Sequence, residues 1–172
     1  MKVIASVLAL TVLSTATSAQ EWGHWYADEG RNPITDVYTA TLSIIQEGET
    51  PASLEWMCAV TPAEDSGDSR VDFGLVIGEG LPQRPQQNQT PIHYRVDSGE
   101  ARTVYASQSL NGRYLLVGPD RAAQMFHEMT AANEQIVFTI NHLDYYTLPV
   151  NSLGEAAARF APRCPTIAPE PY

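Results

Sequence analysis

The feature that most restricts the fold of this 172-residue chain is a pair of cysteines, Cys58 and Cys164, which lie 106 residues apart. Neither has a second cysteine or a histidine beside it, whereas a metal site needs further ligands at close spacing. Free thiols and a metal pair remain the alternatives to a disulfide. We expect a disulfide that ties an early strand to the C-terminal end, because the N-terminus predicts export to an oxidising compartment.

The first twenty residues predict a cleavable secretory signal. Lys2 precedes an apolar segment, residues 3–13, that is too short to span a bilayer, and small residues follow it. This order predicts cleavage between Ala19 and Gln20, and the alternative is a buried N-terminal helix. We therefore expect a signal peptide at residues 1–19 and one periplasmic or secreted domain at residues 20–172, which is long enough to bury a core.

The charge balance restricts the partners of the exported domain. Loss of Lys2, the only lysine, leaves nine arginines against twenty acidic residues, so the net charge changes from −10 to −11. Such a surface repels nucleic acid and anionic membranes, and it suits a basic protein or a cationic surface. Solubility alone is the alternative role of the charge. No later segment approaches the length of a membrane span, so we expect no stable membrane insertion.

Alternation of apolar and polar residues predicts a mainly β (α+β) fold. The expected strands are residues 37–45, 54–60, 71–77, 92–96, 103–105, 114–117, 136–140 and 145–148. Helical spacing after Pro119 and a capping pair of Ser152 and Glu155 predict two short helices. We expect an antiparallel β-sandwich or a partly open barrel of seven or eight strands, closed by the disulfide.

Two further patterns describe the surface and the interior of this fold. Trp56 and Cys58 alternate with Glu55 and Met57, which places Trp56 and Cys58 together on a buried face. The acidic turn at residues 64–68 and the loop at residues 78–90, which is rich in Pro, Gln and Asn, should be exposed.

Several short motifs also occur in an order that points to one family. They are residues 32–36, the strand ending at Cys58, residues 92–97, residues 105–112, the helix start at Ser152 and the closing Cys164. Over most of the mature chain this order resembles the periplasmic accessory proteins of type VI secretion loci, the VasI/TagO-like group. Pro165 and the acidic turn depart from the pattern of that group. The resemblance implies a non-catalytic envelope protein that acts through protein contacts.

The sequence lacks the motifs of common hydrolases. No serine stands in a Gly-x-Ser-x-Gly segment, and His127-Glu128 has no second histidine at the spacing of a zinc hydrolase. The four histidines are scattered: His24, His93, His127 and His142. We therefore predict a protein that is not an enzyme and uses no metal or cofactor. If it is an uncharacterised hydrolase, His93 is the strongest candidate for its base, because its strand pattern places it on the solvent face near Arg95 and Asp97.

Aromatic residues at the start of the exported domain are candidates for contact with a partner. Trp22, Trp25 and Tyr26 either pack as a cover on the edge of the fold or anchor another envelope or secreted protein. We predict a binding or accessory protein, with a role in type VI secretion if the resemblance extends to function. The alternative is an acidic inhibitor of a basic hydrolase such as lysozyme.

Overall fold

The computed structural model describes residues 22–46, 52–62, 70–78, 89–110, 112–140 and 145–167. Three sequence predictions fall outside these residues: the signal peptide with its cleavage point at Ala19 and Gln20, the acidic turn at residues 64–68, and most of the loop at residues 78–90.

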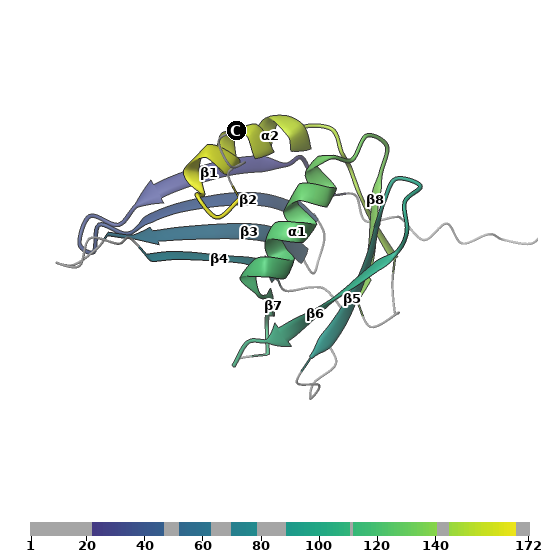
Figure 1. The fold of residues 1–172 in the computed structure, drawn as a ribbon, viewed down its shortest axis with the longest axis horizontal. Coiled ribbons are helices and arrows are strands. Elements are labelled where there is room, and N and C mark those ends of the chain that lie inside the picture. Colours follow the sequence, from purple (N-terminus) through teal and green to yellow (C-terminus); the bar gives the residue numbers. More distant parts are fainter. Residues whose placement is uncertain are drawn as a thin grey trace, which may run out of the picture.

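Nine strands form one antiparallel sheet in the order β1-β2-β3-β4-β7-β6-β5-β8-β9. Their bounds are β1 Tyr26–Arg31, β2 Tyr38–Gln46, β3 Ala52–Thr61, β4 Arg70–Ile77, β5 Thr90–Val96, β6 Arg102–Gln108, β7 Leu115–Val117, β8 Ile136–Ile140 and β9 Tyr145–Leu148. The open sheet curves so that β1–β4 and β5, β6 and β8 form two arms on either side of helix α1 (Figure 1). This confirms the mainly β fold, and the single curved sheet corresponds to a partly open barrel.

The strand that sequence reasoning did not predict is β1. It lies at one edge of the sheet, and nearly all of its side chains are exposed. Such a strand has no alternation of apolar and polar residues to reveal it. Its pairing with β2, from Tyr26 opposite Ser43 to Arg31 opposite Tyr38, is therefore a feature of the tertiary structure.

Helix α1, Pro119–Thr130, lies on the concave face of the sheet (Figure 1). Its buried side chains, which include Met125 and Phe126, recur at the predicted helical spacing and face the core. Trp56 of β3 is fully buried beneath it and donates a hydrogen bond from Nε1 to the carbonyl oxygen of Ala122 at 3.1 Å. The ring of Phe126 lies 6.0 Å from that of Trp56, edge to face, so packing and a hydrogen bond both hold α1 on the sheet.

The disulfide between Cys58 and Cys164 is present, with the two Cα atoms 5.8 Å apart. Cys58 lies on the concave face of β3, the same face as Trp56, as the alternation predicted. Cys164 follows helix α2, Leu153–Phe160, and a 3-10 turn, Ala161–Arg163. The bond therefore fastens the C-terminal segment to the middle of the sheet.

Ser152 does not cap helix α2, so the predicted capping pair with Glu155 is wrong. Its φ of 64° is left-handed, whereas a capping residue adopts an extended backbone. The Ser152 hydroxyl instead accepts a hydrogen bond from the backbone N–H of Trp25 at 3.0 Å. The Ser152 oxygen that the sequence assigned to the helix cap therefore binds a backbone donor 127 residues away.

Two polar clusters fasten the loops and helix α1 to the sheet. Asp97, in the turn after β5, accepts hydrogen bonds from the backbone N–H groups of residues 133–135 at 2.8–3.0 Å. These hydrogen bonds, that from Gln135 foremost, lower the pKa of the Asp97 carboxyl. Tyr94 donates from its hydroxyl to Glu128 Oε2 at 2.7 Å, and Arg102 Nε lies 3.1 Å from the same oxygen. Burial and then the Glu128 contact raise the pKa of the Tyr94 hydroxyl.

Candidate functional site

The aromatic residues at the start of the described chain separate into two groups. Trp25 is 3% exposed, and its Nε1 donates to the carbonyl oxygen of Pro149 at 2.7 Å. Its ring lies 5.8 Å from that of Trp56. Trp25 is thus part of the core and is not available to a partner in this fold, whereas Tyr26 is exposed.

Trp22 joins the two arms of the sheet. It pairs with Gln46 at the end of β2, and its ring lies 6.0 Å from Phe138 of β8 and 6.2 Å from Tyr146 of β9. Because β2 and β8 are far apart in the strand order, this contact closes part of the opening of the curved sheet. For Trp22 the structure therefore shows packing, the first of the two predicted roles.

An exposed apolar surface lies on the convex face of the first arm. We name it the outer patch and define it as Tyr26, Ile45, Met57, Val76 and Leu116, which come from β1, β2, β3, β4 and β7. Apart from the partly buried Val76, these side chains are each 40–45% exposed. The register places Tyr26, Val76 and Leu116 in one row across the sheet. Exposed apolar side chains that gather on one face are one mark of an interaction surface.

Glu55 lies within the outer patch. It pairs with Ser43 of β2 on one side and with Val76 of β4 on the other, in the same row as Tyr26 and Leu116. Within the described part of the chain, Glu55 has no hydrogen-bond or ion-pair partner on its side chain. Burial among these neighbours raises the pKa of the Glu55 carboxyl. Among the described residues, the centre of the patch is therefore a half-buried acid that has no counter-charge.

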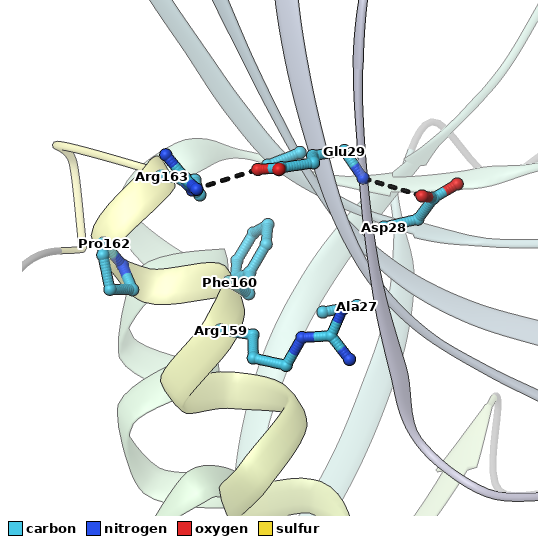
Figure 2. Close-up of a pocket in the computed structure, with 8 residues that line it drawn as sticks. Ala27, Asp28, Glu29, Arg159, Phe160, Pro162 and Arg163 are labelled. Atoms are coloured by element: carbon cyan, nitrogen blue, oxygen red, sulfur yellow. Dashed lines mark hydrogen bonds and ion pairs between the residues drawn. The ribbon is translucent and has the colours of Figure 1, made fainter.

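A cavity of about 350 Å³ lies between β1 and the C-terminal helical segment (Figure 2). Figure 2 shows Arg163 reaching Glu29 across one side of it, with Phe160 beneath. Arg163 Nε lies 3.0 Å from Glu29 Oε2, which also accepts a hydrogen bond from Tyr38 at 2.5 Å. Glu29, one of the two acids that line this cavity, is thus paired twice within the fold. These contacts fasten the edge strand beside Cys164 and give the cavity a structural role.

His93 occupies the convex face of β5, as its strand pattern predicted. Its Nδ1 lies 2.8 Å from Thr103 Oγ1 of β6, and a smaller cavity lies on its other side, towards β8 and β9. Arg95 lines the same cavity, whereas Asp97 points its carboxylate at the backbone of residues 133–135. Asp97 therefore does not lie with His93 and Arg95 at this cavity.

No group of three His, Cys, Asp or Glu side chains is arranged to hold a metal ion in the described ranges. In the same residues, no helix is long and apolar enough to cross a membrane. Comparison of the chain with protein-family models, with curated proteins and with solved structures finds no significant match. The site must therefore be interpreted from its own residues.

The sequence did not identify the outer patch as a site. The alternation of β3 already separated Glu55 and Met57 from the buried Trp56 and Cys58. It gave no sign that Leu116 lies two strands away from Glu55, because that arrangement depends on the pairing of β4 with β7. Residues brought together by long-range strand pairing carry no local signal of their proximity.

Proposed function

We propose that this protein is a non-catalytic binding protein of the cell envelope or of the secreted fraction, and that the outer patch is its contact surface. The observation that carries the proposal is the half-buried Glu55 among the exposed apolar side chains of the outer patch. Its partner is a protein that presents an apolar surface with an arginine or a lysine in it. That cation neutralises Glu55, and the apolar side chains bury each other in the interface.

Charge and chemistry both support a basic partner. A carboxylate loses hydration when neighbours bury it, and an opposite charge within a few ångströms restores the lost stabilisation. The chain has a net charge of −10, so a basic partner is also attracted from a distance. Arginine is the best candidate for the contact residue because it is enriched at interfaces and pairs with carboxylates through two parallel hydrogen bonds.

The compartment rests on three observations. The N-terminal segment has the pattern of a secretory signal, the fold carries a disulfide, and the order of motifs resembles the VasI/TagO-like accessory proteins. We extend the proposal to an envelope partner on this basis. Service to a type VI secretion machine is the specific form of the proposal that the resemblance favours.

The test uses two variants that change the charge equally. Leu116→Arg places a cation in the outer patch, whereas Ile34→Arg places one in an exposed turn away from the sheet face. The mature protein and both variants are immobilised and exposed to envelope extract of the source cell. We expect a basic protein to be retained by the parent and by Ile34→Arg and to be lost by Leu116→Arg.

Binding of the recovered protein is then measured with purified components. Glu55→Gln keeps the shape of the side chain and removes its charge, and we expect affinity to fall about tenfold or more. Equal retention of the basic protein by the parent, Leu116→Arg and Ile34→Arg would overturn the assignment of the surface. A parent dimer that Leu116→Arg converts to a monomer would identify a second copy as the occupant and overturn the choice of partner.

Inhibition of a basic hydrolase is a second candidate, because Glu55 in an acidic domain suits a cationic enzyme as well as a structural protein. We expect an inhibitor to slow lysozyme at low ionic strength and to lose that effect as salt is added. Glu55→Gln should weaken the inhibition. Full lysozyme activity at low salt in the presence of excess protein would exclude lysozyme as the inhibited enzyme.

A further inference from the structure

The smaller cavity, about 190 Å³ in volume, lies on the convex face of the second arm. Strand register defines its floor and walls. His93 of β5, Thr139 of β8 and Tyr145 of β9 form one row, and Arg95 with Val137 forms the next row. Adjacent rows on one face are about 7 Å apart, so a long side chain in one row reaches the other. All five residues line the cavity.

Thr139 is the unusual residue of this group. It is 4% exposed, and its Oγ1 is a buried side-chain oxygen that has no hydrogen-bond partner among the described residues. His93 and Tyr145 flank it in the same row, and all three residues line the cavity. A buried hydroxyl without a partner destabilises a fold, and valine would fill the same space without that cost. The hydroxyl therefore needs an explanation beyond packing.

Arg95 supplies the second observation. Its side chain is exposed and, within the described part of the chain, forms no ion pair or hydrogen bond. The guanidinium is a fixed cation with several donors, and it binds a carboxylate through two parallel hydrogen bonds. The remaining walls are mainly apolar or aromatic, through Val137 and the exposed ring of Tyr145. The cavity thus combines a cation, an unsatisfied hydroxyl and an apolar wall.

We propose that this cavity binds a small organic carboxylate with an apolar or aromatic body. The carboxylate pairs with Arg95 and accepts a hydrogen bond from the Thr139 hydroxyl, while the body packs on Val137 and Tyr145. The cavity is smaller than the pockets of about 300–1,000 Å³ that hold drug-sized molecules, so a single ring is the largest body that fits. This site is separate from the outer patch and does not depend on the proposed function.

The test is a titration of the isotope-labelled mature protein, followed by amide chemical shifts. Benzoate and phenylacetate are the ligands, and benzyl alcohol is the neutral control of similar size. We expect the two carboxylates to shift the amides of residues 93–95, 137–139 and 145–147 in a saturable manner. Benzyl alcohol should cause much smaller shifts, because it cannot pair with Arg95. Absence of saturable shifts at these residues with both carboxylates would overturn the site.

Three variants separate a binding role of Thr139 from a structural one. Thr139→Val should raise the melting temperature of the free protein and weaken benzoate binding about tenfold, whereas Thr139→Ser should keep the binding. Arg95→Gln should weaken it at least as much. Arg70→Gln, which changes an exposed arginine of β4 outside the cavity, is the matched control and should bind normally. Unchanged affinity in Thr139→Val or in Arg95→Gln would overturn the proposal.

Discussion

The two faces of the curved sheet differ in whether the polar groups described here have hydrogen-bond or ion-pair partners. On the concave face the buried donors have partners: Trp56 and Trp25 donate to backbone carbonyls, and Tyr94 donates to Glu128. On the convex face Glu55 and Thr139 have no such partner within the described ranges. Buried polar groups in native proteins are almost always paired, so the buried Thr139 hydroxyl is an exception among the described residues, and Glu55 is a half-buried carboxyl in a comparable position.

This difference indicates that the concave face stabilises the fold and that the convex face carries the proposed binding sites. The concave face carries helix α1, the disulfide and the aromatic core, and these hold the fold together. The convex face keeps two groups that lower the stability of the free protein. Departures from local consistency are expected at functional sites, and both proposed sites lie on this face.

The largest expected effect tests whether stability resides on the concave face. Phe126→Ala removes a buried ring that contacts Trp56 and should lower the free energy of unfolding by about 3–5 kcal/mol. Leu116→Ala, on the convex face, should lower it by less than about 1 kcal/mol, because much of that side chain is already exposed. Urea unfolding measures both. Similar losses in the two variants would contradict the comparison.

Removal of the disulfide should have the next largest effect. We expect the double variant Cys58→Ala, Cys164→Ala to lose about 2–5 kcal/mol of stability, because the bond closes a long loop of the unfolded chain. Unfolding of the oxidised parent, the reduced parent and the double variant gives the measurement. Reduction should lower the stability of the parent and leave the double variant unchanged. A parent that is insensitive to reduction would show that the bond does not stabilise the concave face.

The smallest effect concerns the pH dependence of Glu55 on the convex face. Its pKa is raised in the folded protein, so folding favours the protonated carboxyl and loses that contribution as the pH rises through the raised pKa. Glu55→Gln should therefore be more stable than the parent at neutral pH, and the difference should shrink as the pH falls below the ordinary value of 4.5.

Thermal unfolding from acidic to neutral pH measures this difference. Glu100→Gln, which replaces an acid in the exposed β5–β6 turn, serves as the matched control and should not reproduce the trend. If Glu55→Gln is less stable than the parent at neutral pH, the carboxylate is compensated in the free protein, and the contrast between the two faces disappears.

Much of the fold was predictable because burial on one face leaves a local pattern. Alternation identified eight strands, and Pro119 marked the start of α1. The alternation also placed Cys58 and Trp56 on one face, which the structure confirms. The same reasoning missed β1, whose side chains are nearly all exposed, and it assigned Ser152 to a helix cap when a distant backbone donor binds its hydroxyl.

The candidate sites were less predictable than the fold. The sequence indicated that Glu55 and His93 face outward, but neither the apolar row around Glu55 nor the cavity beside His93 has a motif. Tyr26 was proposed as a contact together with Trp22 and Trp25, and only Tyr26 lies in the outer patch. All three residues are aromatic, so the sequence did not distinguish them. The two tryptophans pack on other aromatic rings of the fold, which only the tertiary structure shows.

The sequence by itself determined eight of the nine described strands, the helices, the cysteine pair and the excess of acidic residues, because each depends on residue type and short-range spacing. The tertiary structure alone decided the strand order, the closure of the two arms by Trp22, and the neighbours of Glu55 and Thr139. The physical reason is that a group's hydration and its hydrogen-bond partners are set by residues distant in the chain. Whether a carboxylate or a hydroxyl is left without a partner is therefore known only after the sheet has formed.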